Sequence, residues 1–335
     1  MADKLVWGIM GAANIALQKV VPGMLKDETS EIRGFASRDA GKAAEASARF
    51  GLPTSYGSYE ALLADPVIEA VYIPLPNHLH VPWSLKALAA GKHVLCEKPI
   101  ALDADEAAQL VEARDKSGRQ VLEAFMVRQH PQWLRVREIV ASGEIGDVVL
   151  MQTTLSYYNA DPANVRNQAD IGGGALYDVG CYAVLLSRFV FGSEPLRAIA
   201  LIDRDPVLET DRLTGAILDF GEGRQLSFAT STQLVPFQRM QIFGSRGRIE
   251  VPVSLNAPQG ETTTLFVDGS GAIDGSGVRT ETIEACDQYM LQGAAAVRIF
   301  RGEAQPEFPI EDAVLNMRAI DALYLSAKTG SWETI

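Results

Sequence analysis

The sequence is poor in cysteine and has no long apolar run. Its three cysteines, Cys96, Cys181 and Cys286, are far apart and odd in number. This favours a reducing compartment and argues against structural zinc, because zinc sites use closely spaced cysteine pairs. No stretch reaches the roughly 18 consecutive apolar residues of a membrane span, and the start, MADKLVWGIMG, lacks the features of a signal peptide. We therefore expect a cytoplasmic protein.

Basic residues are also in deficit. The chain has 30 Lys and Arg against 42 Asp and Glu, a net charge of −12 at pH 7. This charge repels phosphate backbones and anionic membranes, so we expect neither nucleic acid nor a membrane as partner. A phosphorylated cofactor remains compatible, because a few local cations and a helix N-terminus can bind it. With 335 residues, of which 47% are hydrophobic, the chain is long enough for two globular domains.

The first 124 residues alternate strand and helix patterns. Five apolar runs predict strands at 5–10, 31–37, 70–74, 93–97 and 121–125. Amphipathic stretches between them predict helices at 15–25, 40–50, 59–63, 82–90 and 104–117. Strict alternation predicts a doubly wound parallel sheet with helices on both faces, as in a Rossmann domain.

The remainder, 125–335, has a different pattern of apolar runs, with few helical stretches between them. Successive apolar runs predict strands at 147–158, 196–203, 213–220, 224–232 and 239–244. Helices are expected at 175–190, 286–300 and 311–328, and a flexible loop at 268–277. Strands that follow one another through tight turns predict an α+β domain built on a large, mostly antiparallel open sheet. We place the domain boundary between residues 124 and 125.

The first strand runs into a glycine- and alanine-rich turn. A dinucleotide fingerprint needs a glycine for the tight turn, a small residue where the backbone reaches the pyrophosphate, and a third for helix packing. Here these are Gly11, Ala13 and Ala16, with Asn14 and Ile15 at the helix start. Two alanines replace glycines. The turn predicts a dinucleotide site, although flavin and S-adenosyl methionine sites share the architecture, and an ordinary turn is the alternative.

The end of the second strand carries positive charge. NAD binders place a carboxylate here for the ribose 2′-hydroxyl, whereas NADP binders place cations for the 2′-phosphate. This chain has Ser37 and Arg38, with Lys42 one turn later, while Asp39 lies beyond the usual carboxylate position. A hydroxyl and a guanidinium suit a phosphate. We therefore predict NADP rather than NAD, against the alternative of a solvated arginine.

Two more polar segments follow strands of the first domain. The segment 76–80, PNHLH, and the segment 97–99, EKP, both lie at carboxyl ends of parallel strands, where open α/β sheets bind ligands. His78 and His80 are two residues apart and no carboxylate clusters with them. We therefore predict no metal site.

These segments together resemble the Gfo/Idh/MocA family of glucose-fructose oxidoreductase and inositol dehydrogenase. The resemblance spans nearly the whole chain. Its motifs are WGIMGAANIA, ASR, PNHLH, EKP, FMVRQHPQ, GGGALYDVGCY and the ending FPIEDAVLNMRAIDALYLSA. The resemblance implies a Rossmann domain followed by a substrate domain whose open sheet face pairs subunits, as a homodimer or homotetramer.

The resemblance also implies site residues. Lys98 would lie beside the nicotinamide, and a helix of the second domain would contribute Asp178 and Tyr182, which a spacing of four puts on one helix face. Tyrosine at the last position resembles the branch of dihydrodiol dehydrogenase and NADP-linked xylose dehydrogenase, because inositol dehydrogenases have histidine there. The cofactor set extends to Pro76, Asn77, His80 and Glu97; Arg128, Tyr157 and Asp178 are the expected substrate contacts.

These residues predict a hydride-transfer enzyme. Oxidising an alcohol requires a base for the hydroxyl proton, and a nearby ammonium stabilises a tyrosine phenolate. We expect Tyr182 to be the acid/base, assisted by Lys98, and Asp178 to orient Lys98 or a sugar hydroxyl. The substrate would be an aldose or a related cyclic polyol or diol. Two alternatives stay open: an NAD(P)-dependent glycoside hydrolase of the same family, and a non-catalytic NADP sensor.

Overall fold

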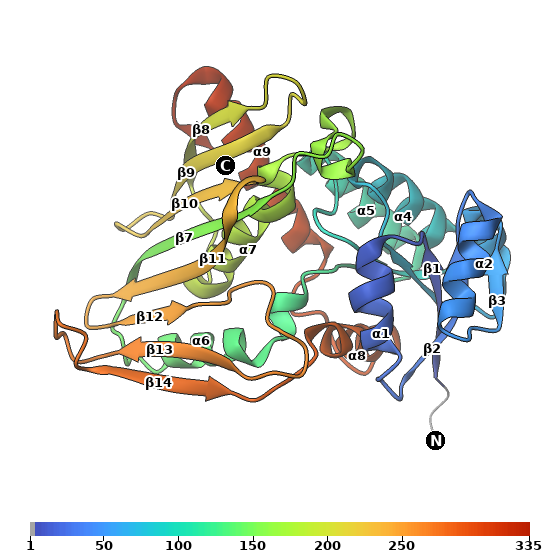
Figure 1. Cartoon of the computed structure of the whole chain (residues 1–335), viewed down its shortest axis with the longest axis horizontal. Coiled ribbons are helices and arrows are strands. Elements are labelled where there is room, and N and C mark those ends of the chain that lie inside the picture. Colours follow the sequence, from blue (N-terminus) through green and yellow to red (C-terminus); the bar gives the residue numbers. More distant parts are fainter. Residues whose placement is uncertain (1–3) are drawn as a thin grey trace. The chain divides into compact units, whose positions relative to one another are not determined.

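The computed structural model describes residues 4–335 and divides into two compact units (Figure 1). The first contains the chain up to Gln129 together with Asp287–Val314, and the second contains His130–Cys286 and Leu315–Ile335. The first crossing between units thus falls a few residues after the predicted boundary. A larger difference is that 287–314, expected in the second domain, belongs to the first unit.

The first unit contains a six-stranded sheet whose neighbouring strands are all parallel. Its order across the sheet is β3 (Thr54–Tyr56), β2 (Ser30–Ala36), β1 (Leu5–Met10), β4 (Ala70–Ile73), β5 (His93–Cys96) and β6 (Val121–Glu123). The chain builds outward from β1 in one direction and from β4 in the other. Right-handed crossovers therefore place helices on both faces, and the predicted doubly wound sheet is confirmed.

Helical segments connect these strands. They are η1 (Ala16–Val20), α1 (Val21–Met24), α2 (Ala40–Arg49), α3 (Tyr59–Ala64), η2 (Asn77–Leu79), α4 (His80–Ala89), α5 (Ala104–Ser117) and η3 (Met126–Gln129). Helix starts follow their side-chain caps: Asp39 accepts from the N–H groups of Gly41 and Lys42, and Asp103 from that of Glu106. The segment η1 is a π-helical turn that continues directly into α1.

Helix α8 (Gln288–Phe300) explains why a late part of the chain joins the first unit. It packs against α1 at Gly23, where an added Cβ would lie 2.9 Å from the backbone nitrogen of Met290. Lys26 Nζ pairs with Asp287 Oδ2 at 2.7 Å, and the ring of Phe300 lies 5.6 Å from that of Trp7. These contacts join residues far apart in sequence, so amphipathic periodicity does not reveal them.

The second unit contains a nine-stranded sheet. Its order is β14 (Val278–Ile283), β13 (Thr263–Asp268), β12 (Arg248–Val251), β11 (Gln233–Gly244), β7 (Val148–Tyr158), β10 (Gln225–Ser231), β9 (Asp211–Asp219), β8 (Arg197–Arg204) and β15 (Glu333–Thr334). The β7 and β10 pair is parallel and every other pair in this order is antiparallel. The prediction of a large, mostly antiparallel sheet is confirmed.

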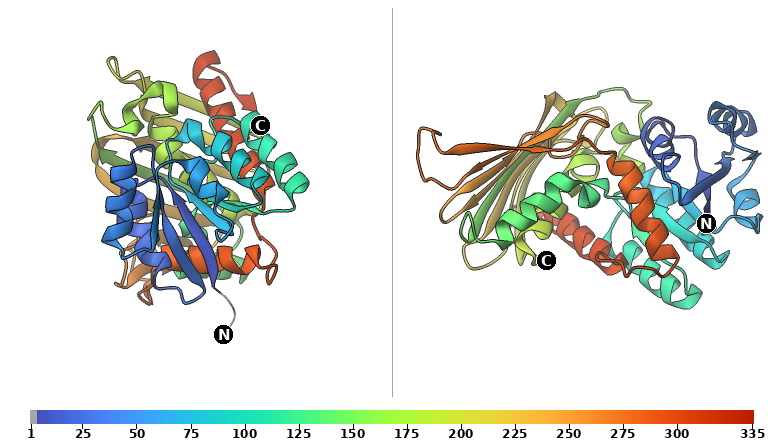
Figure 2. Two further views of the ribbon diagram at one scale, coloured as in Figure 1. Left: turned by 90° about the vertical axis from the view of Figure 1, so that its right-hand side faces the viewer. Right: turned by 90° about the horizontal axis from the view of Figure 1, so that it is seen from below.

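The long helices of this unit lie on one face of its sheet (Figure 2). They are α6 (Pro131–Ala141), α7 (Cys181–Phe191) and the part of α9 (Ile310–Thr329) that begins at Leu315. The short segments η4 (Val165–Asn167), η5 (Ala169–Ile171) and η6 (Leu176–Gly180) lie between β7 and α7 along the chain. Trp133 Nε1 of α6 donates to the Ser254 carbonyl at 2.8 Å, and Ser326 Oγ of α9 accepts from Ala200 N–H at 3.1 Å.

The stretch Ala169–Phe191 is long and apolar enough to cross a membrane by length and composition alone. However, 78% of its most apolar window is buried within the fold. Within α7, every residue from Cys181 to Val190 is buried. This apolar stretch therefore contains a core helix of the second unit, whose side chains the nine-stranded sheet and its neighbouring helices cover.

Candidate cofactor and substrate sites

The turn after β1 has the geometry that a dinucleotide fingerprint requires. Gly11 has a φ of +119°, and an added Cβ would lie 2.9 Å from Leu75 Cδ2, so a side chain is strained there on both counts. Ala16 is fully buried, which explains the need for a small residue. The helical run begins at Asn14, directly after this turn, and the first N–H groups of a helix are the ones that bind an anion.

The residues after β2 expose cationic side chains, whereas the carboxylate of Asp39 serves as a helix cap. Asp39 Oδ1 accepts the N–H groups of Gly41 at 2.9 Å and Lys42 at 3.2 Å, so this carboxylate caps α2. Arg38 and the side chain of Lys42 are exposed, and Ser37 Oγ accepts the Asp39 N–H at 3.2 Å. The groups offered at this strand end are therefore a hydroxyl, a guanidinium and an ammonium.

The EKP segment follows β5, next to the end of β4. The Glu97 N–H donates to the Ile73 carbonyl at 3.0 Å, and the Tyr72 hydroxyl donates to Glu97 Oε1 at 2.6 Å. Burial raises the pKa of Tyr72 well above its usual range, so the hydroxyl keeps its proton. On the other side of Lys98, the Ile100 N–H donates to Glu123 Oε1 at 2.8 Å. Lys98 therefore lies between two anchored residues.

His80 is held between two backbone segments. Its side chain is buried, and its ring nitrogens lie 2.7 Å from two backbone oxygens, Nδ1 from that of Pro99 and Nε2 from that of Leu75. Burial lowers the pKa of His80 to about 4, so the neutral ring donates to one of these carbonyls at a time. The His80 ring therefore joins the segments that carry Asn77 and Lys98 through these two backbone oxygens, and its direct contact with a cofactor stays a prediction.

Arg128, predicted as a substrate contact, has partners inside the first unit. It is 7% exposed, its Nη2 pairs with Asp312, and its guanidinium carbon lies 4.1 Å from the ring centroid of Phe308 and 5.6 Å from that of Phe125. All four residues belong to the first unit. A buried guanidinium needs such partners, because an unpaired one would be strongly destabilising. The structure therefore gives Arg128 a role inside the first unit.

Asp178 lies in a polar cluster of the second unit. The Tyr157 hydroxyl donates to Asp178 Oδ2 at 2.6 Å, and Arg166 Nε lies 3.0 Å from the same oxygen. Burial, followed by the charge of Asp178, raises the pKa of Tyr157, so this hydroxyl remains a donor. The carboxylate is thus held in one orientation by a tyrosine from β7 and an arginine from η4. Arg166 was not predicted, because it lies in a loop segment without a motif.

The predicted helix 175–190 is present as two segments. Asp178 lies in η6, a π-helical turn, and Tyr182 lies in the first turn of α7 and is 5% exposed. A π turn contains an extra residue per hydrogen-bonded ring, so the four-residue spacing does not have regular α-helical geometry. At Gly180 an added Cβ would lie 2.7 Å from Leu176 Cδ1, so a larger residue would have to displace the end of that side chain.

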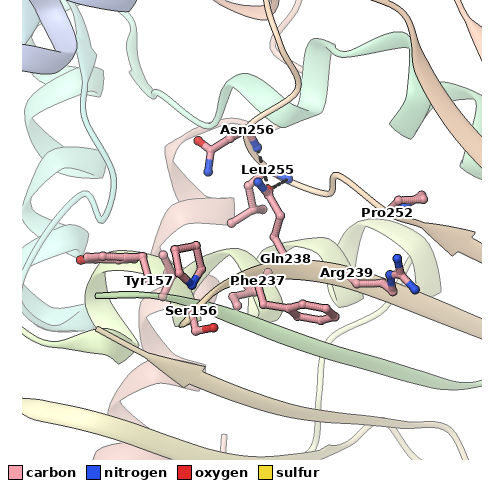
Figure 3. Close-up of a pocket in the computed structure, with 11 residues that line it drawn as sticks. Ser156, Tyr157, Phe237, Gln238, Arg239, Pro252, Leu255 and Asn256 are labelled. Carbon is pink, nitrogen blue, oxygen red and sulfur yellow. Dashed lines mark hydrogen bonds between the residues drawn. The ribbon is translucent and has the colours of Figure 1, made fainter. Parts of the chain in front are cut away.

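A cavity of about 440 Å³ opens on the second unit beside this cluster (Figure 3). Its walls come from β7, β11, the loop after β12 and η6, and its lining residues are Leu155, Ser156, Tyr157, Val179, Pro236, Phe237, Gln238, Arg239, Pro252, Leu255 and Asn256. Gln238 Oε1 accepts the N–H groups of Leu255 and Asn256, each at 2.9 Å, and so fixes the loop. Aromatic surface and amide groups together suit a polyhydroxylated ring.

One buried carboxylate near this cluster is not predicted from the sequence. Asp211, at the start of β9, is 1% exposed and accepts hydrogen bonds from the Leu176 N–H at 2.6 Å and the Tyr324 hydroxyl at 3.0 Å. Burial raises the pKa of Asp211 to about 6. Its partners are 35 and 113 residues away, and no local pattern indicates such contacts. Within residues 4–335, no group of three or more His, Cys, Asp or Glu side chains is placed to hold a metal ion.

Comparison with protein families matches both parts of the chain. Residues 5–125 match the model described as an oxidoreductase family with an NAD-binding Rossmann fold. Residues 133–250 match the model described as a GFO/IDH/MocA C-terminal domain. Two separate models, one for each half, therefore point to the same family.

Curated proteins and solved structures agree with this assignment. The chain is 44% identical to an uncharacterized oxidoreductase of Rhizobium meliloti, over 99% of this chain and all of that one. It is 37% identical to a D-xylose 1-dehydrogenase (NADP(+)) of Haloferax volcanii, over 98% of each chain. A 3-ketoreductase from Actinomadura kijaniata, solved with NADP and TDP-benzene, has a TM-score of 0.90 and 26% identity, over 97% of this chain and 98% of that one.

An aldose-aldose oxidoreductase from Caulobacter crescentus, solved with glycerol, shares the fold, with a TM-score of 0.90 and 24% identity over 99% of this chain and all of that one. The Rhizobium and Haloferax relatives are named as an oxidoreductase and a dehydrogenase. The chain belongs to the Gfo/Idh/MocA family and is an oxidoreductase with an NAD(P)-binding Rossmann domain.

Proposed function

We propose that the protein is an NADP-dependent dehydrogenase that oxidises an aldose, or a related cyclic polyol or diol, at a ring CH–OH group. The observation that carries the proposal is the 37% identity to the D-xylose 1-dehydrogenase (NADP(+)), which extends over 98% of the chain. The chain places Lys98 at the carboxyl end of β5 and Asp178 and Tyr182 on consecutive helical turns, which supports the same activity.

The donor set of the first unit fits NADP. The turn at Gly11, with its positive φ, would bring the backbone against a pyrophosphate, and Ala13 and Asn14 lie beside it. Ser37, Arg38 and Lys42 would hold the 2′-phosphate; Pro76, Asn77, Glu97 and Lys98 would line the nicotinamide end. Bound NADP supplies the hydride acceptor. The carboxylate that an NAD-type ribose contact would need caps α2.

The protein's own side chains transfer one proton in this reaction. When the C–H bond of the substrate carbon breaks and its electron pair leaves with the hydride, the hydroxyl proton passes to Tyr182, and a carbonyl group forms. An aldose oxidised at its hemiacetal carbon gives a lactone. Lys98 stabilises the phenolate form of Tyr182 by its positive charge and binds the substrate oxygen. Asp178, held by Tyr157 and Arg166, accepts a hydrogen bond from a sugar hydroxyl.

Substrate binding is assigned to the cavity beside Tyr157 in the second unit. We assign the face of the nine-stranded sheet opposite its helices to subunit pairing, as a homodimer or homotetramer. We place the enzyme in the cytoplasm. The division into a cofactor domain and a substrate domain follows the two units, with 287–314 included in the cofactor part.

The test is a panel of aldoses, inositols and cyclic diols offered to the purified protein with NADP or NAD, with reduced cofactor measured by absorbance. We expect D-xylose or a similar aldose to reduce NADP faster than NAD. If no compound reduces NADP and no lactone or ketone is reduced by NADPH, the proposal is wrong. Release of sugar from a glycoside without net NADPH formation would indicate a hydrolase instead.

A further inference from the structure

Asp211 lies directly against the segment that carries Asp178. It belongs to β9, and its carboxylate reaches the start of η6, where Oδ2 accepts the Leu176 N–H at 2.6 Å. The Tyr324 hydroxyl donates to Oδ1 at 3.0 Å, and the Thr214 hydroxyl lies 3.3 Å from Oδ2. A carboxylate that is 1% exposed and accepts from three donors is a fixed point in the fold.

The glycine turn before η6 is shaped around this carboxylate. Gly174 has a φ of +126°, and an added Cβ would lie 1.8 Å from Asp211 Oδ1. The Gly174 carbonyl accepts the N–H of Asp178 at 3.1 Å, and the Gly174 N–H donates to the Arg166 carbonyl at 2.8 Å. The backbone of one residue therefore contacts Asp211 and is bonded to both members of the Asp178 and Arg166 ion pair.

We propose that Asp211 is a positioning residue for the reaction: by fixing Gly174 and the start of η6, it sets where Asp178 meets Tyr157 and Arg166. This inference rests on the proposed function, because it assigns Asp178 a contact with substrate. Asp211 itself is buried and acts through the backbone of residues 174–178.

The charged and titratable groups around Asp211 come from several elements. Tyr324 of α9 donates to it, Arg204 of β8 attracts its charge, and its own charge helps to raise the pKa of Tyr157 of β7. The ring of Tyr177, in η6, lies 5.1 Å from that of Tyr324. Asp211 therefore constrains η6 mechanically, and its charge adds to burial and to Asp178 in raising the pKa of Tyr157.

The first measurement needs no substrate. Hydrogen exchange followed by mass spectrometry compares wild type with Asp211→Ala, and with Asp219→Ala as a control at the other end of the same strand. We expect exchange of residues 174–180 to accelerate at least about tenfold in Asp211→Ala only. Asp211→Asn, which keeps an acceptor for the Leu176 N–H, should restore slow exchange. Unchanged exchange at 174–180, or acceleration spread over the whole second unit, would overturn the proposal.

The second measurement is kinetic. Asp211→Ala should lower kcat at least about tenfold while KM for NADP stays within about twofold, because the cofactor residues lie in the other unit. In an Asp178→Asn background, the same change should lower kcat less than about twofold, since its effect passes through Asp178. Multiplicative losses in the double variant would overturn the proposal.

Tyr324→Phe provides a milder variant, should Asp211→Ala fail to fold. It removes one donor to Asp211 and leaves the Leu176 bond, so exchange at 174–180 should rise by a smaller factor, and no rise would overturn the proposal. The two proposals separate cleanly. Absence of NADP reduction and of carbonyl reduction by NADPH across the whole panel refutes the proposed function, whereas hydrogen exchange tests without any substrate whether Asp211 fixes the start of η6.

Discussion

Arg38 offers the sharpest test of cofactor choice. The side chain is exposed at the end of β2, beside Ser37, while the carboxylate of Asp39 caps α2. A hydrogen bond to a charged group contributes about 1.5 to 3 kcal/mol, and about 1.4 kcal/mol corresponds to a tenfold change in binding. Arg38→Ala should therefore raise KM for NADP about ten- to hundredfold. KM for NAD should stay the same, because NAD has no 2′-phosphate.

The assay measures kcat/KM for both cofactors with the best sugar of the panel. Arg49→Ala is the matched control, because Arg49 is an exposed arginine in the last turn of α2 whose guanidinium carbon lies 5.4 Å from the ring centroid of Phe50. It should leave both values unchanged. Equal losses with NADP and NAD, or no loss with either, would refute the assignment of Arg38 to the 2′-phosphate, and the preference for NADP would then need another source.

Three further predictions concern the second unit. Tyr182→Phe should lower kcat about 10²- to 10⁴-fold, the usual contribution of an acid/base group, without raising KM for NADP; near-normal turnover would exclude Tyr182. Gly174→Ala should destabilise the fold by about 2 kcal/mol or more in urea unfolding, whereas Gly223→Ala, with a φ of +78° and open space for a Cβ, should cost about 1 kcal/mol. Burial raises the pKa of Asp211 from 3.8 to about 6. The folded state therefore gains about 3 kcal/mol of stability below about pH 4, where Asp211 is protonated, and loses it as pH rises through about 6. Asp211→Asn should abolish this decline in the free energy of unfolding.

Local signals account for the parts of the fold that were predicted. Helix α5 spans Ala104–Ser117, the range that its sequence pattern indicates, because Asp103 caps its start and Gly118 ends it in the left-handed conformation. Strand β3 was missed because its three residues, TSY, contain no apolar run. The pattern of α8 does not show that the helix belongs to the first unit, because its partners there are distant in sequence; Lys26 and Asp287, for example, are 261 residues apart.

The site residues show the same difference between local sequence signals and contacts that depend on the whole fold. Residues at strand ends, such as Gly11, Arg38 and Lys98, are visible from sequence because ligands bind at the carboxyl ends of parallel strands. His80 and Arg128 look like ligand contacts by residue type, and the structure shows the first between two backbone oxygens and the second in an ion pair with Asp312. Burial depends on the whole fold, and a motif does not encode it.

Helix irregularity marks the proposed sites more closely than amphipathic pattern does. Among residues 4–335, the π-helical turns are η1 and η6. The first follows the fingerprint turn at Gly11, and the second carries Asp178. A π turn weakens regular helix geometry and persists only where packing supports it, which is often beside a functional site. The two units have unrelated sheets, so this coincidence does not follow from a shared fold.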